Sequence, residues 1–263
     1  MKKTNLIIAI FILLISFSIA KAQDTTKTDD FNFDDVPVDD QKTPYIGVGG
    51  GVLFMPNLIN NEDLNKLAKD VGIPDLGSNI LMSGGGGFTA VGIVPNLRLG
   101  VYAAGGVISN QSEISLSGTN YTKVLKLASS FTAVQIDYAI GFSKGFNMFP
   151  GIMLGYGKNS LSFTQTKSSG GTFNEVISDT LFSKNSNFNK INSITSSNIL
   201  LIPQLNFEYN LTQFIMLRVG AGYKLLLKGD WTDDNSKIIT SVPEKIGTNG
   251  LTGQIGLFLG LFQ

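Results

Sequence analysis

The sequence predicts an all-β chain that closes into an antiparallel, up-and-down β-barrel of about eight strands. Three observations predict this class: apolar runs whose side chains alternate with a period of two, an even number of such runs, and connections that alternate between short and long. Composition agrees, because 43% of the 263 residues are hydrophobic and only 15% are charged, which is too apolar for a disordered chain. We therefore expect one barrel domain over residues 44–263.

The first 22 residues have the three parts of a secretory signal peptide. Lys2 and Lys3 form a basic start, residues 6–20 are apolar, and the A-x-A cleavage pattern is met by Ala20 and Ala22. A membrane anchor is the alternative, but this apolar run falls short of the roughly 20 residues that a spanning helix needs. We expect cleavage after Ala22, which leaves 17 basic and 20 acidic residues and a net charge of −3.

The next segment, residues 23–43, carries seven Asp against two Lys. Such a segment cannot bury enough apolar surface to fold by itself. We expect a disordered acidic leader, with a docking tail for a periplasmic partner as the alternative.

Eight apolar runs follow Pro44, and each is long enough for a barrel strand. They lie at about residues 45–55, 79–94, 97–108, 124–142, 149–158, 198–209, 214–228 and 250–262. In the seventh run Leu217 and Val219 share one face and Arg218 and Lys224 share the other. One face of each strand is therefore apolar and the other is mixed.

The connections favour a barrel that spans a membrane. Residues 95–96, 143–148 and 210–213 are short turns, whereas residues 56–78, 109–123, 159–197 and 229–249 form long links. Strict alternation puts all long links at one end, as in barrels with periplasmic turns and extracellular loops. Aromatic residues near the strand ends suggest two interfacial bands: Phe142, Phe149, Tyr209, Phe214 and Phe262 by the turns, and Phe54, Phe131, Tyr223 and Trp231 by the long links. A soluble exported barrel that holds a hydrophobic ligand is the alternative.

Over residues 44–263 the chain resembles the small outer-membrane β-barrel family of Gram-negative bacteria. Members of that family usually end in an aromatic residue that the assembly machinery reads, and here Phe258 and Phe262 precede the final Gln263. The resemblance implies an assembly signal at these two Phe, a place in the cell outer membrane, and outer-membrane lipid and the assembly machinery as partners. Pro203 departs from the pattern, and we expect a bulge or a missing hydrogen bond there.

Five charged residues have the parity of the inward face: Arg98, Asp137, Glu208, Arg218 and Lys224. An eight-stranded barrel is just wide enough for side chains to fill it. Opposite charges in so narrow a lumen must pair, so we expect a network that plugs the barrel. A proton path or a small-ligand site is the alternative, and a narrow, porin-like channel is a further one.

The chain has no His and no Cys. This excludes His-dependent nucleophilic catalysis, thiolate metal sites and disulfides, and the absence of a basic stripe argues against nucleic acid. The glycines at residues 84–87 lack the Lys-Ser/Thr of a phosphate loop. We expect no enzyme, no metal and no cofactor, although chemistry by carboxylates alone stays open.

The first long link contains a helical pattern. Leu64, Leu67, Ala68 and Val71 recur at helical spacing after an Asn61 cap and before a stop at Gly72. A short helix there could cover the barrel mouth, lie on the membrane or touch a partner. The long link over residues 159–197 is where adhesion or recognition would reside. The sequence thus predicts a non-enzymatic barrel of structural, adhesion or surface-interaction type.

Overall fold

A computed structural model describes residues 45–116, 118–143, 145–168, 190–227, 229–243, 246 and 249–262. The predicted signal peptide, the acidic leader, Gln263 and the centre of the 159–197 link lie outside the described residues. No helix within these ranges is long and apolar enough to cross a membrane.

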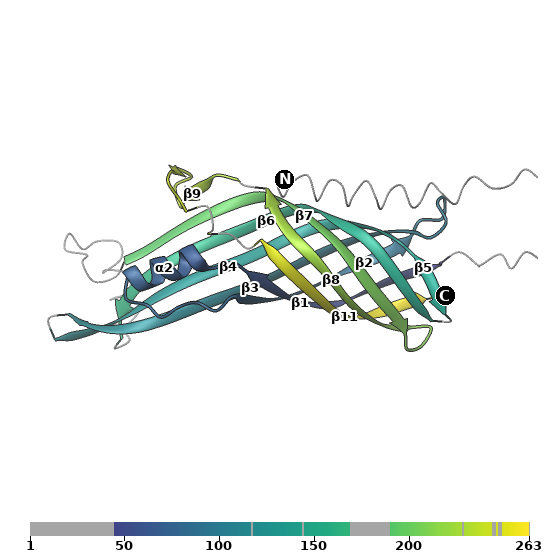
Figure 1. Cartoon of the computed structure of the whole chain (residues 1–263), viewed down its shortest axis with the longest axis horizontal. Coiled ribbons are helices and arrows are strands. Elements are labelled where there is room, and N and C mark those ends of the chain that lie inside the picture. Colours follow the sequence, from purple (N-terminus) through teal and green to yellow (C-terminus); the bar gives the residue numbers. More distant parts are fainter. Residues whose placement is uncertain are drawn as a thin grey trace, which may run out of the picture. The chain divides into compact units, whose positions relative to one another are not determined.

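Eight long antiparallel strands of the described chain close into a barrel (Figure 1). They are β1 (Gly47–Ile59), β2 (Asn79–Ala90), β3 (Leu97–Leu116), β4 (Thr119–Tyr138), β6 (Phe146–Lys167), β7 (Lys190–Asn210), β8 (Ile215–Leu227) and β11 (Gly250–Phe262). Each strand pairs with the next, and β11 returns to pair with β1. The predicted fold class, a closed up-and-down barrel, is confirmed.

Three shorter strands attach to this barrel. β5 (Ile140–Ser143) continues β4 along β6 after a break at Ala139. β9 (Trp231–Asp233) and β10 (Ile238–Ile239) form a small hairpin, and β9 pairs with residues 194–196 of β7. Neither addition changes the order of the eight barrel strands.

The two faces of the strands differ as the period of two predicts. Leu217 and its cross-strand neighbour Leu257 point outward and are 38% and 46% exposed, whereas Arg218 and Gln254 point inward and are buried. Leu, Val, Ile and Phe side chains dominate the outward face of most strands. An exposed apolar band around a closed barrel is the surface that lipid covers.

Four neighbouring strands are much longer than the others. β3, β4, β6 and β7 have 20, 20, 22 and 21 residues, against 12 or 13 in the other four. Their extra length projects beyond the barrel at the end that carries the long links (Figure 1). We call this projection the wall, and it comprises residues 107–116, 119–128, 160–167 and 190–195.

The wall corrects the prediction of a loop over residues 109–123. β3 and β4 stay paired as far as Leu116 and Thr119, and Gly118 occupies the turn with a φ of 79°. Outside a membrane the outward side chains need not be apolar, and here Ser109, Gln111 and Glu113 face outward. The apolar alternation therefore ends while the strands continue.

The backbone pairing has a gap at Pro203. β7 pairs with β8 at Leu201 and Leu225 and again at Gln204 and Gly222, with the register unchanged between them. Pro203 lacks the N–H that would continue the ladder. Of the two predicted outcomes, missing bonds are therefore found and a bulge is not.

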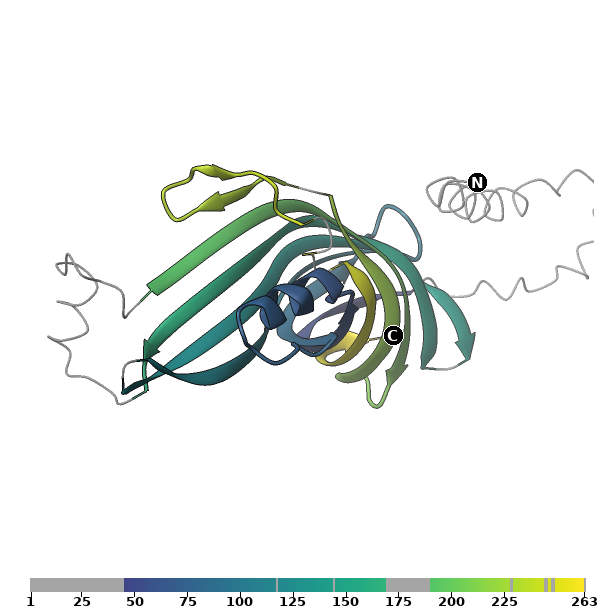
Figure 2. The same cartoon turned by 60° about the vertical axis from the view of Figure 1, so that its left-hand side comes forward.

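α2 (Glu62–Asp70) confirms the predicted helix and lies across the open end of the barrel (Figure 2). Leu64 and Ala68 are buried in the same core as the inward residues of the strands. Asn61 occupies the predicted N-cap position, but its side chain makes no capping hydrogen bond, because its amide donates to the carbonyl of Gly77 instead. Asn60 Oδ1 accepts the hydrogen bond from the N–H of Glu62, at 3.0 Å.

The predicted aromatic bands are half right. Phe142, Tyr209, Phe214, Phe54 and Tyr223 are exposed on the outside of the barrel, where they can meet the bilayer interfaces. Four other members are buried and cannot belong to the bands: Phe149, Phe262, Phe131 and Trp231. Phe149, Phe262 and Phe131 occupy inward positions on their strands. Nearness to a strand end, on which the prediction rested, does not show whether a side chain points inward or outward.

Candidate functional site

Two cross-strand pairs bring opposite charges into the lumen. Arg98 on β3 lies directly opposite Asp137 on β4, and Glu208 on β7 lies opposite Arg218 on β8. Arg98 Nε and Nη2 donate to Asp137 Oδ2 at 3.1 and 2.6 Å. Arg218 Nε donates to Glu208 Oε1 at 2.7 Å. Each pair is thus formed by neighbours in the sheet.

Further hydrogen bonds join the two pairs across the bore. Arg98 Nη1 donates to Glu208 Oε2 at 2.8 Å, so Glu208 binds both arginines. Arg218 Nη1 donates to the hydroxyl of Tyr102 at 2.9 Å. Tyr102 is on β3 and Arg218 on β8, which are four strands apart in either direction around the barrel. The network therefore spans the full width of the lumen.

Aromatic rings enclose the two guanidinium groups. Arg98 Cζ lies 3.7 Å from the centre of the Phe149 ring and 4.2 Å from that of Phe88. Arg218 Cζ lies 4.3 Å from the Phe258 ring centre and 5.3 Å from that of Phe88. Cations over aromatic faces are attracted to the ring quadrupole, more strongly where water is excluded. Phe88 contacts both arginines and so links the two halves of the network.

The network carries no net charge and is sealed from solvent. Arg98, Asp137, Glu208 and Arg218 are each at most 2% exposed. Burying an unpaired charge is very costly, and here two cations meet two carboxylates. Gln135 Nε2 donates a further hydrogen bond to Asp137 Oδ2. Both carboxylates are engaged by arginines.

Lys224 also points inward but lies outside this network. The prediction that all five inward charges form one network is therefore wrong for Lys224. Its Nζ contacts Ser129 Oγ at 3.1 Å and Met82 Sδ at 3.9 Å. No carboxylate of the described chain is within ion-pair distance of it. Lys224 is six residues beyond Arg218 on β8, or roughly 20 Å along the strand, so equal parity did not mean equal depth.

The described chain is thus a closed eight-stranded barrel with an apolar outer band and buried ion pairs in its interior. The fold is that of a small outer-membrane β-barrel. No protein family and no curated protein matches the sequence.

Several solved outer-membrane barrels are similar to the chain in fold. Ail, the attachment invasion locus protein of Yersinia pestis, is 10% identical over 84% of this chain and 99% of its own, with a TM-score of 0.38. A major outer membrane protein from Thermus thermophilus is 11% identical over 81% and 99%, with a TM-score of 0.40. The outer membrane protease OmpT from Escherichia coli is 12% identical over 83% and 95%, with a TM-score of 0.29. These likenesses concern the fold alone.

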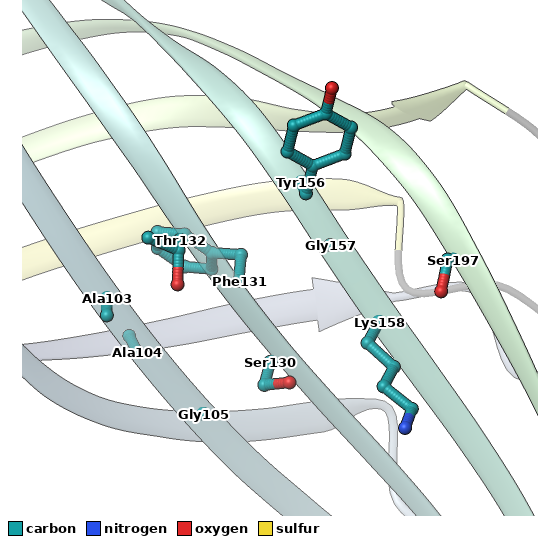
Figure 3. Close-up of a pocket in the computed structure, with 10 residues that line it drawn as sticks. All are labelled: Ala103, Ala104, Gly105, Ser130, Phe131, Thr132, Tyr156, Gly157, Lys158 and Ser197. Atoms are coloured by element: carbon teal, nitrogen blue, oxygen red, sulfur yellow. The ribbon is translucent and has the colours of Figure 1, made fainter.

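The barrel also has a broad hollow on its outer surface, of about 660 Å³ (Figure 3). It is lined by Ala103, Ala104, Gly105, Ser130, Phe131, Thr132, Tyr156, Gly157, Lys158 and Ser197. Small outward side chains on β3 and β4 form its floor, and Tyr156 and Lys158 rise from β6 beside them. The hollow lies where the apolar band gives way to the polar outer face of the wall.

Sequence reasoning missed the aromatic members of the charge network. Phe88 and Tyr102 have inward parity on β2 and β3, and that signal could have found them. Phe258 and Phe262, the predicted assembly signal, both point inward, with ring centres 5.6 and 6.1 Å from that of Phe88. Their reading by an assembly machinery stays a prediction.

No group of three Asp or Glu side chains in the described chain could hold a metal ion. The charge network joins strands on opposite sides of the lumen. It offers charge neutralisation and rigidity.

Proposed function

We propose that this outer-membrane barrel is a non-enzymatic surface-interaction protein, of structural or adhesion type, that is closed to solutes. The observation that carries the proposal is the combination of a bore crossed by buried ion pairs with a wall that rises beyond the barrel. The first feature argues against transport, and the second offers a surface to partners.

The plug is supported by the size of the barrel and by the bonds within it. Eight strands leave an interior that side chains alone can fill. Arg98 to Glu208 and Arg218 to Tyr102 each cross the lumen. A narrow channel is the alternative function, and it would require these bonds to open.

A free strand edge supports the proposal that the wall is an interaction surface. β2 pairs with β3 only as far as Met82 and Gly106, so within the described chain residues 107–116 of β3 pair on one side alone. A free edge offers backbone N–H and C=O groups to an extended peptide. Glu113 and the hydroxyl groups nearby keep the adjoining outer face polar.

A place in the cell outer membrane is supported by the exposed apolar band and by the predicted signal peptide. Outer-membrane lipid and the assembly machinery are then its general partners. A soluble barrel with a hydrophobic ligand is disfavoured, because Leu217, Val219 and Leu257 would face water.

Conductance and fractionation test the barrel and its plug. The protein should co-sediment with outer membranes, need detergent for extraction and migrate differently on gels when heated. In planar bilayers it should pass no steady current. Large single-channel currents would instead support the channel.

Adhesion tests the wall. Val107 and Ala128 are directly paired, so a tight turn joining these two residues removes the outer β3–β4 hairpin without shifting the register. Cells that display the shortened protein should adhere less to glass and serum-coated surfaces than cells with equal amounts of the full-length barrel. Equal adhesion would contradict a role for the wall.

A further inference from the structure

The concave face of β4, β6 and β7 changes character where these strands leave the barrel. One paired row across them consists of the buried polar residues Ser129, Asn159 and Ser196. The next inward row consists of Leu127, Leu161 and Ile194. Apolar side chains around an open mouth would face water, so this row needs a cover.

α2 and the residue after it supply part of that cover. Leu64 and Ala68 enter the core, and Lys123 Nζ on β4 donates to the carbonyl of Val71 at 3.0 Å. This bond holds the end of the helix against the wall. Leu67 and Val71 then line the space between helix and strands.

A cavity of about 160 Å³ remains in that space. Leu67 and Val71 line one side, Leu125, Leu161, Phe163 and Ile194 line the other, and Asn192 supplies the one polar side chain. No charged residue of the described chain lines the cavity. Leu67 is 36% exposed and Asn192 is exposed, so the cavity can be reached between them.

We propose that this cavity binds a small uncharged apolar molecule, about the size of one hydrocarbon ring. Protein interiors are close-packed and seldom leave voids larger than a water molecule. An enclosed cavity of roughly 150 Å³ lined by Leu, Ile and Phe stays dry and takes up benzene or xenon, and the pocket here has a similar volume and lining but is open on one side. An ion or a sugar would lose its hydration here and gain at most the Asn192 amide. This site stands independently of the surface role proposed above.

Methyl NMR of the full-length protein in lipid nanodiscs tests the site with fluorobenzene as the probe. The methyl signals of Leu125, Leu161 and Ile194 should shift and saturate as fluorobenzene is added. Leu217 and Leu257 face the lipid, so their signals should change in proportion to the fluorobenzene dissolved in the bilayer, without saturation. Benzoate, which is similar in size but charged, should leave the cavity signals unchanged.

A substitution that fills the cavity separates binding from partition into lipid. Leu67→Trp should abolish the saturable shift, and Val71→Phe does the same from a second position if the first variant folds poorly. Leu211→Trp is the matched control, because Leu211 is 54% exposed in a short turn at the other end; it should bind like wild type. The proposal is overturned if the cavity signals do not respond, respond only in proportion, or saturate equally in both cavity variants.

Discussion

Arg218 and Tyr102 meet across the whole width of the barrel, with Arg218 Nη1 donating to the Tyr102 hydroxyl at 2.9 Å. Because the two residues come from strands on opposite sides, this bond joins halves of the sheet that are not otherwise adjacent. Glu208 makes the second such connection through Arg98. The interior thus adds long-range links to a sheet whose backbone bonds are all between neighbours.

Removing the Tyr102 hydroxyl tests the value of this link. Tyr102→Phe keeps the ring beside Phe258 and Arg218 and deletes only the acceptor. We expect the free energy of unfolding to fall by about 2 kcal/mol, since hydrogen bonds to charged groups contribute roughly 1.5–3 kcal/mol. Urea unfolding in lipid vesicles measures it. Tyr209→Phe, at an exposed outward position, should change the free energy of unfolding little. Equal losses in both variants would mean that the bond between Arg218 and Tyr102 adds no particular stability.

Glu208 should be the most sensitive carboxylate, because it neutralises two buried arginines whereas Asp137 pairs with one. Glu208→Ala should lower the free energy of unfolding by about 3–5 kcal/mol, the usual cost of leaving a buried partner charge unpaired. Asp137→Ala should cost less. Glu113→Ala, on the exposed wall, serves as the control.

A double-mutant cycle separates pairing from packing at the same site. Arg218→Met combined with Glu208→Gln should lose less than the sum of the two single changes, because the pair couples. Additive losses would mean that the two side chains fill space independently.

The period of two predicted which face of each strand is apolar, and inward parity predicted that Arg98, Asp137, Glu208 and Arg218 enter one lumen. The pairing among them was harder to predict, because it depends on the register between strands. Lys224 shares the parity of Arg218, and within the described chain its Nζ has only Ser129 Oγ and Met82 Sδ as hydrogen-bond partners. The β3–β4 part of the wall was missed for a different reason: beyond the apolar band, Ser and Gln on the outer face of β3 give no apolar alternation to detect.

Replacing Lys224, the buried cation that has no carboxylate partner in the described chain, should stabilise the protein rather than destabilise it. Lys224→Met keeps the length of the side chain and removes a buried charge that no carboxylate of the described chain balances. We expect stability to rise by on the order of 1 kcal/mol or more, because desolvation of an unpaired charge is costly. Arg98→Met should destabilise instead, since it removes the arginine of Asp137 and leaves Glu208 with Arg218 alone. Lys126→Met on the outer face of the wall should be nearly neutral, and a loss of stability in Lys224→Met would point to an uncounted partner.

The outward face is tested by placing a charge in the middle of the apolar band. Leu217 and Leu257 are directly opposite each other on β8 and β11, and both are exposed. Leu217→Arg or Leu257→Arg should cost about 2–4 kcal/mol if this row lies near the middle of the bilayer. Ser109→Arg, on the outward face of the wall, should cost little because that part of β3 lies beyond the band. Vesicle refolding yields and urea unfolding of the three variants measure the difference. Equal behaviour of all three would mean that the band does not face lipid, and it would revive the soluble barrel.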